Sequence, residues 1–426
     1  MGSKGLARSI IAFAAVLWLP TAPVIGRAQV TEKVIHGFHG TDGSSPVGPL
    51  VIDSAGNLYG VAANGGAGQN GVVFKLTRVA SGQFSESVLY SFAGGDDGAS
   101  PRGGVIFDQA GNLYGVTASG GGAGCFSGCG TVYELSRNSH GHWGKKELYR
   151  FTGRSDGGTP QSSLTFDASG NLYGTTNVGG DSSCNSGGCG TVFQLSPTAS
   201  GRWKATVLHT FTGQADGASP FLAGVIFDDA GRLYGVTSTG GANDMGTVFQ
   251  LTRMPDGTWK DTVLYAFAGG SDGTFPSATL ALHQGALYGA TYAGGNEGGA
   301  CPVNGCGTIF KLAPGAGGWE KSLVYAFQGA DGIETLATPA FDRAGNLYGT
   351  TFEGGSGPCS VCGTAFELTP SASGPWQETV LHSFGARTGD AGTPEAGVVL
   401  DQSGALYGTS QLGGTDGLGT VYQITH

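Results

Sequence analysis

The sequence has little charge and no helical pattern. Asp, Glu, Lys and Arg make up 12% of its 426 residues, roughly half of the share usual in soluble globular domains. It has no strict Gly-X-Y period, no heptads and, beyond the N-terminal segment, no apolar run of membrane-spanning length. These absences exclude a collagen, a coiled coil and a helical membrane bundle. With 39% hydrophobic and 10% aromatic residues, the chain is also too apolar to be disordered.

Glycine and proline are abundant instead. The chain has 82 Gly and 17 Pro, close to a quarter of all residues. Apolar and aromatic residues occur in short runs between these turn formers, which is typical of β-strands. The composition therefore predicts an all-β, turn-dense fold.

The N-terminal segment, residues 1–28, has the layout of a secretory signal peptide. Lys4 and Arg8 precede an apolar run over residues 9–25, and Gly26-Arg27-Ala28 offers a small-x-small cleavage site. Prolines 20 and 23 interrupt the run and disfavour the alternative, a retained membrane anchor. We therefore expect a secreted or periplasmic protein without a membrane span, whose domain covers residues 29–426.

Export makes the protein more acidic. Removal of the segment takes away three basic residues and no acid, so the formal net charge falls from −10 to −13. An acidic surface repels phosphate backbones. Nucleic acid is therefore not an expected partner, and we expect a monomer.

The string Gly-x-Leu-Tyr-Gly occurs seven times, at spacings of 54 to 61 residues. Its tyrosines are Tyr59, Tyr114, Tyr173, Tyr234, Tyr288, Tyr348 and Tyr407. Each repeat reads as four short strands, with an aromatic residue at the start of the fourth. An Asp-x-x-Gly turn lies between the first two strands, except in the fifth repeat, where Leu282 replaces the aspartate. Such a period is typical of a propeller or a solenoid.

The two ends of the chain decide between a ring and an open stack. Residues 34–38 match a fourth strand that precedes the first full repeat, and residues 419–424 end the seventh repeat at its third strand. The additional N-terminal strand thus matches the fourth strand that the seventh repeat lacks. Closing the ring with it removes two exposed sheet edges together. We predict a seven-bladed β-propeller of four-stranded blades, in which the N-terminal strand completes the last blade.

The repeat also resembles a known family. Asp-x-x-Gly-Asn-Leu-Tyr-Gly, then Gly-Gly, then Gly-Thr-Val-Phe-x-Leu, with Asp-Gly-x-x-Pro between units, is similar to the GloVer tandem repeat of exported bacterial proteins. The likeness extends from about Val34 to the C-terminus. It implies an exported repeat protein, and it implies no catalytic residues.

The eight cysteines form four local pairs, all just before the third strand and only in repeats with a long preceding loop. The pairs are Cys125/Cys129, Cys184/Cys189, Cys301/Cys306 and Cys359/Cys362. An even count in an exported chain favours four disulfides. Zinc held by four cysteines of neighbouring repeats is one alternative, and free thiols are another.

The sequence gives no sign of an active site. His36, His209 and His382 replace a fourth-strand tyrosine of other repeats and are interpreted as packing substitutions, so no histidine-rich metal site is predicted. No phosphate loop, dinucleotide fingerprint or nucleophile elbow occurs in a strand–helix setting. We expect a non-catalytic binding module for a glycan or a protein. The alternatives are an envelope scaffold, or a propeller hydrolase or lyase that uses channel carboxylates.

One aspartate per repeat marks a candidate ligand face. These residues follow the fourth strands, on the face that also carries the cysteine loops: Asp42, Asp97, Asp156, Asp216, Asp272, Asp331 and Asp390. Each can cap its own turn, and seven together would also create a shared negative potential around one opening. We expect a ligand there that is cationic, a neutral sugar or bridged by Ca²⁺. No other cofactor is indicated.

Overall fold

The computed structural model describes residues 1–2, 30–79, 82–122, 124–184, 187–356, 359, 361–372, 374–385 and 387–426. Most of the predicted signal peptide, including its cleavage site, lies outside these ranges, so that assignment stays a prediction. No helix of the described residues is long and apolar enough to cross a membrane.

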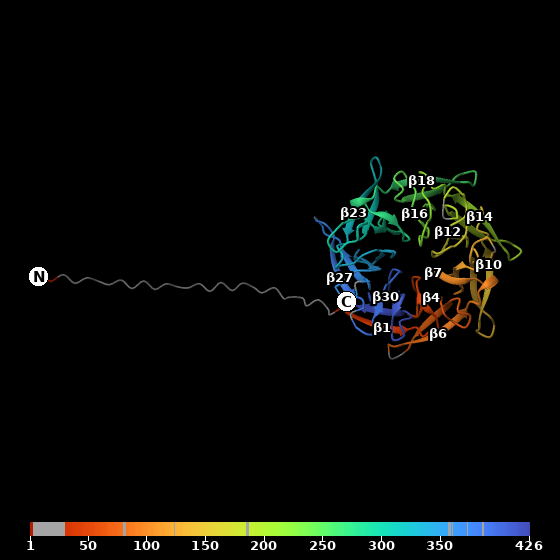
Figure 1. Cartoon of the computed structure of the whole chain (residues 1–426), viewed down its shortest axis with the longest axis horizontal. Helices are drawn as coiled ribbons and strands as arrows, with labels where there is room; N and C mark the ends of the chain where they lie inside the picture. The colour runs from red at the N-terminus through yellow and green to blue at the C-terminus, as the bar shows by residue number, and fades with distance from the viewer. Residues whose placement is uncertain are drawn as a thin grey trace.

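Over the described residues, seven antiparallel sheets are arranged in a ring (Figure 1). Blade 1 contains β2 (Ser44–Pro46), β3 (Val51–Ile52), β4 (Leu58–Asn64), β5 (Val72–Arg78) and β6 (Phe84–Ser91). Blade 2 contains β7 (Ala99–Phe107), β8 (Leu113–Ser119), β9 (Thr131–Arg137) and β10 (Trp143–Arg150). Blade 3 contains β11 (Thr165–Phe166), β12 (Leu172–Thr176), β13 (Thr191–Pro197) and β14 (Trp203–Thr210). Blade 4 contains β15 (Ile226–Phe227), β16 (Leu233–Thr237), β17 (Thr247–Arg253) and β18 (Trp259–Ala266).

The second half of the ring repeats this order. Blade 5 contains β19 (Thr274–Pro276), β20 (Ala281–His283), β21 (Ala286–Ala293), β22 (Thr308–Gly315) and β23 (Gly318–Ala326). Blade 6 contains β24 (Ala340–Phe341), β25 (Leu347–Thr351), β26 (Thr364–Thr369) and β27 (Gln377–Ser383). Blade 7 contains β29 (Val399–Leu400), β30 (Leu406–Ser410), β32 (Thr420–Thr425) and β1 (Thr31–Gly37). Outside these sheets lie a small ribbon of β28 (Ala391–Gly392) with β31 (Leu412–Gly413) and two 3-10 turns, η1 (Gly95–Asp97) and η2 (Gly270–Asp272).

The predicted closure is confirmed. Strand β1 pairs with β32 in antiparallel register from Thr31↔Thr425 to Gly37↔Thr420, so that the first and last strands lie in one blade, and β1 lies beside the C-terminus in Figure 1. Phe38, which follows β1, is buried and packs edge-on against Phe74 of blade 1 at a centroid distance of 5.2 Å. The closing strand thus completes one sheet and also contributes to the next interface between blades.

The core lies between the blades. The seven repeat tyrosines are each at most 7% exposed, because each reaches the neighbouring blade. Tyr173 of blade 3, for example, packs against Phe227 and Trp259 of blade 4, with ring centroids at 5.0 Å and 6.3 Å. The repeat tyrosines therefore form much of the core between blades.

The glycine after each repeat tyrosine has a steric reason. A Cβ on Gly174 would lie 2.7 Å from the ring of Phe193 on the adjacent strand β13, closer than real contacts allow. The same clash would occur at Gly60, Gly235, Gly289 and Gly349. Because the aromatic ring of the third strand lies across this position, the repeat tolerates only glycine there.

All eight cysteines form the four predicted disulfides, and no free cysteine is found among the described residues. The zinc and free-thiol alternatives are therefore wrong for this structure. Four disulfides indicate folding in an oxidising compartment.

Candidate functional site

Two sets of loops share one face of the ring, which we call the loop face. They are the loops between the second and third strands, including the four disulfide loops, and the connections from each fourth strand to the next blade. In every blade a backbone N–H of the first set donates to a carbonyl of the second, as from Gly121 to Gly95 and from Gly180 to Arg154. The opposite face, which we call the turn face, carries the Asp-x-x-Gly turns.

The aspartates of the Asp-x-x-Gly turns are structural. Asp167 accepts the N–H groups of Ser169 and Asn171 through Oδ1, and the hydroxyl of Tyr173 through Oδ2 at 3.0 Å. Burial opposes ionisation of this carboxyl, but these hydrogen bonds hold its pKa below the usual value. In six blades the turn is thus tied to its own core tyrosine, and blade 5 has Leu282 in place of the aspartate.

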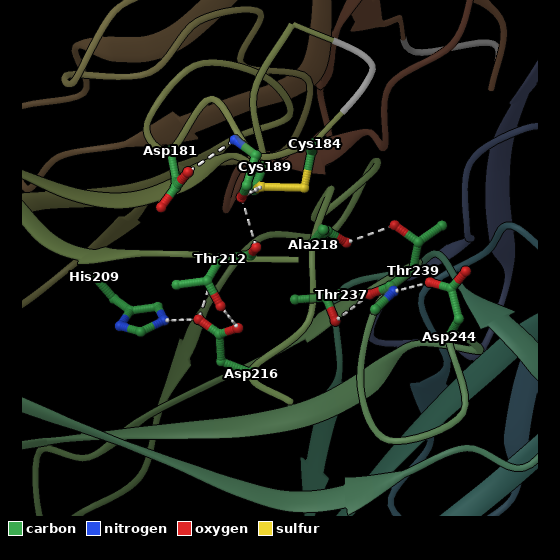
Figure 2. The surroundings of a disulfide bond; sticks show 12 residues. Asp181, Cys184, Cys189, His209, Thr212, Asp216, Ala218, Thr237, Thr239 and Asp244 are labelled. Carbon is green, nitrogen blue, oxygen red and sulfur yellow. Dashed lines mark hydrogen bonds and ion pairs between the residues drawn. A yellow bond between two sulfur atoms is a disulfide. The ribbon is translucent and has the colours of Figure 1, made fainter. Parts of the chain in front are cut away.

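Six of the seven candidate aspartates cap the connection that carries them. Asp97 accepts the backbone N–H of Ala93 at 2.7 Å and the hydroxyl of Tyr90 at 2.8 Å. Asp216 accepts the N–H and hydroxyl of Thr212 and contacts Nε2 of His209 at 3.2 Å (Figure 2). Equivalent caps are made by Asp42, Asp156, Asp272 and Asp331.

Asp390 departs from this pattern. One of its oxygens accepts the N–H of the following residue, Ala391, at 3.0 Å, and its other oxygen lies 3.4 Å from Nε2 of His382. The side chain of Asp390 has no solvent exposure.

A second position faces these aspartates from the next blade and is charged in six blades, while blade 3 has Ala205 there. It lies four residues before the tyrosine or histidine of that blade's fourth strand. Lys145 and Lys321 occupy it in two blades, where each ammonium is 2.8 Å from the aspartate and only 6% of the side chain is exposed. Other blades have acids here, namely Glu32, Glu86, Asp261 and Glu378.

The pKa values of the acids at this position are raised. Burial, followed by repulsion from Asp42, raises the pKa of Glu86 to about 7. Burial and Asp331 do the same to the pKa of Glu378, also to about 7. One carboxyl oxygen of each glutamate is buried without a hydrogen bond. Each glutamate therefore takes up a proton in the folded state at a pH where the unfolded chain has lost it.

This arrangement predicts a pH-dependent stability difference. Because the folded-state pKa of both glutamates is raised, their contribution to stability is present below pH 4.5 and is lost as pH rises towards 7. The double variant Glu86→Gln, Glu378→Gln stays neutral, so its melting temperature relative to wild type should increase between about pH 5 and pH 8. Calorimetry at both pH values checks this, with exposed Glu320→Gln as the control. A difference that is constant with pH would contradict the expectation.

A small cavity lies on the ring axis, lined by the segments that lead into the first strands of all seven blades. Its volume is about 50 Å³, enough for a few water molecules and far below the several hundred Å³ of a typical ligand site. Glu395 is the one carboxylate among its described lining residues. It pairs with Arg102 at 3.0 Å and accepts a hydrogen bond from Gln411. None of the seven candidate aspartates lines this cavity.

The disulfide loops present apolar side chains to solvent. Phe126 is fully exposed and Val303 is 91% exposed, each between the two cysteines of its disulfide. Val361 lies between Cys359 and Cys362 and is 49% exposed. In these three disulfide loops the apolar side chain at the tip is thus exposed to solvent, although burial of an apolar side chain is strongly favoured.

In three of the four pairs the second cysteine anchors its loop in the core, and Cys362 of the fourth pair is half-buried. Cys129, Cys189 and Cys306 are fully buried, and the disulfide of blade 3 rests on the neighbouring connection, where the hydroxyl of Ser183 donates to the carbonyl of Thr212 at 2.8 Å (Figure 2). In the blades without a disulfide, the equivalent position holds Asn70, Met245 or Leu418. The disulfides therefore fix the loops, whose tips stay exposed.

Grooves between blades open on the turn face. One of them has a volume of about 640 Å³ and lies between blades 1 and 2, lined by Asp53, Tyr59, Lys75, Arg137 and Trp143 among others. Two related grooves, of about 460 and 510 Å³, lie between blades 7 and 1 and between blades 6 and 7. Acids, bases and aromatic rings together are a suitable lining for a polar ligand such as a sugar.

Sequence reasoning missed the contacts of the three fourth-strand histidines. Interpreted as packing substitutions, His36 and His209 in fact contact Asp42 and Asp216 at 3.1 and 3.2 Å. A signal was present in the sequence. Wherever the fourth strand has this histidine, the facing position in the next blade is an acid, and both lysines face tyrosine blades.

Comparisons with known proteins identify the repeat family. A solved structure from Thermus thermophilus, described as a presumed oxidoreductase (glucose dehydrogenase), is 15% identical over 93% of this chain and all of its own, with a TM-score of 0.38. No curated protein matches the chain. The family model of the Gloeobacter/Verrucomicrobia repeat matches residues 25–221, 182–301 and 296–426, which covers the whole ring. The chain therefore belongs to the Gloeobacter/Verrucomicrobia repeat family.

Proposed function

We propose that the protein is an exported, non-catalytic binding module that captures a protein ligand on its loop face. The observation that carries this proposal is the exposure of Phe126, Val303 and Val361 at the tips of disulfide-anchored loops. Loops held by a rigid scaffold are where binding residues concentrate. Because these loops are already ordered, little conformational entropy is lost on binding.

The net charge of the chain favours a basic ligand segment. On the loop face, Asp96 is 82% exposed and pairs with Arg150 at 3.1 Å, and Asp244 and Glu297 are exposed in neighbouring loops. The formal net charge of the chain is −10, so cationic partners are attracted over a distance of about a Debye length. The expected ligand combines apolar anchors with Lys or Arg.

A peptide-display selection on the purified chain tests this proposal. We expect selected peptides with an apolar centre and basic flanks. Phe126→Ser or Val303→Ser should weaken peptide binding about 30-fold, as expected for the loss of an anchor side chain. Met254→Ser on the turn face, which also removes an exposed apolar side chain, is the matched control and should leave affinity unchanged. Loss of binding in the control alone would refute the loop face.

A glycan ligand is the second candidate, and the groove lined by Tyr59 and Trp143 favours it. Binding to a glycan array distinguishes a glycan ligand from a protein ligand. Under the glycan alternative, Lys75→Ala would reduce binding to the array and Phe126→Ser would not.

A further inference from the structure

Three potential metal ligands converge where the ring closes. Glu32 lies on the closing strand β1, His382 on β27 of blade 6, and Asp390 on the connection into blade 7. One ligand atom from each lies within 4.8 Å of the other two. Within the described ranges, this is the one group of three His, Cys, Asp or Glu side chains that meets this condition.

The group is buried, and two of its potential metal-ligand atoms have no hydrogen bond. The side chain of Glu32 is 1% exposed and that of Asp390 is 0% exposed. Glu32 Oε1 and His382 Nε2 are both buried without a hydrogen-bond partner. Two buried carboxylates at this separation are stable only if a proton or a cation lies between them. The 17% exposure of the His382 side chain leaves an approach from solvent.

At the other junctions the charge of the aspartate is compensated in other ways. The Asp97 and Asp272 junctions use a buried lysine. At the two other histidine junctions, the imidazole lies closer to its aspartate, 3.1 Å for His36 and 3.2 Å for His209. At the closing junction the distance is 3.4 Å, and it is no hydrogen bond. The other junctions thus serve as internal comparisons, in which a lysine or a closer histidine contacts the aspartate.

The separation of His382 from Asp390 suits a small transition-metal ion. Two ligands on a tetrahedral Zn²⁺ at about 2.1 Å each are separated by about 3.4 Å, the separation found between His382 and Asp390. One imidazole with two carboxylates is a donor set for Zn²⁺ rather than for Ca²⁺, which prefers oxygen ligands throughout. We propose that Glu32, His382 and Asp390 bind one Zn²⁺-type divalent cation, which fastens the closing strand to blade 6.

Arg387 contacts Glu32 without blocking the proposed cation site. Its guanidinium donates to Glu32 Oε2 at 3.0 Å and to the backbone carbonyl of Glu32, and its side chain is 65% exposed. It therefore orients the carboxylate while leaving Oε1 available to the ion. Second-sphere hydrogen bonds of this kind are common for metal ligands.

Calorimetric titration of the EDTA-treated chain with Zn²⁺ tests the site. All variants carry His140→Gln and His142→Gln, which remove two exposed histidines of one loop. We expect saturable binding of one ion and a higher melting temperature with Zn²⁺. His382→Tyr should lower the affinity at least about 100-fold, more than the loss of a second-sphere partner, and should abolish the thermal shift. Because tyrosine fills this position in four other blades, this variant is expected to fold.

His209→Tyr is the matched control, since its junction also combines a histidine with two acids, Asp216 and Asp261, and it should bind Zn²⁺ as wild type does. Glu32→Gln provides a second variant if His382→Tyr fails to fold. Absence of saturable binding in wild type overturns the proposal, because a proton then stabilises the pair. Equal binding by His382→Tyr, or an equal loss in His209→Tyr, also overturns it.

Discussion

Deleting residues 29–40 should destroy the cooperative melting transition or cause the chain to aggregate. The deletion removes β1, leaves the edge of β32 without its partner and exposes backbone donors and acceptors that can pair with other chains. It also removes Phe38 from the interface with blade 1, which alone costs about 3–5 kcal/mol. Circular dichroism during heating, together with size-exclusion chromatography, measures both outcomes.

Removal of residues 1–28 alone is the control for this truncation, and it should leave the melting temperature unchanged. The single substitution Phe38→Ala should be intermediate, because it leaves the β1–β32 hydrogen bonds intact. If the longer deletion melts at the wild-type temperature, the N-terminal strand does not close the ring.

Tyr173→Ala should lower the free energy of unfolding by about 3 kcal/mol or more. The side chain is 3% exposed and fills the interface between blades 3 and 4, where it contacts Phe227 and Trp259. Its truncation leaves a cavity that two separate sheets would have to move to fill. Denaturant unfolding monitored by tryptophan fluorescence measures the loss.

Tyr173→Phe separates packing from hydrogen bonding. It keeps the ring but removes the hydroxyl that donates to Asp167 and accepts from Gln194 at 2.9 Å. We expect a cost of about 1 kcal/mol, well below that of the alanine variant. Equal costs for both variants would mean that the hydroxyl network, rather than the packing between blades, holds the tyrosine.

The fold was predictable because its signals recur in every repeat. The spacing of the Gly-x-Leu-Tyr-Gly strings determines seven equivalent units, and the strand before the first unit matches the strand missing from the last. The cysteine pairs were predictable for a related reason, since each pair lies within one loop. In both cases the interacting residues are close in sequence or occupy the same position in every repeat.

The chemistry at the blade junctions was not predictable in the same way. Its partners come from different repeats, as with Lys145 and Asp97, 48 residues apart. Glu32 and His382 meet only because the ring closes. The exposure of the loop tips was not predictable either, because Phe126 and Val303 resemble ordinary apolar loop residues in the sequence. Only the structure shows that both side chains project into solvent. The co-occurrence of a histidine in one blade with an acid in the next is the sequence signal that would have indicated these junctions.

Hydrogen–deuterium exchange on the complex with a selected peptide tests the location of the binding face most directly. If the loop face binds the peptide, protection should appear in the second-to-third-strand loops, around residues 120–130 and 294–307. Exchange in the Asp-x-x-Gly turns around residues 53–57 and 108–112 should not change. Protection confined to those turns, with unchanged exchange in the disulfide loops, would contradict the account and place binding in the grooves of the turn face.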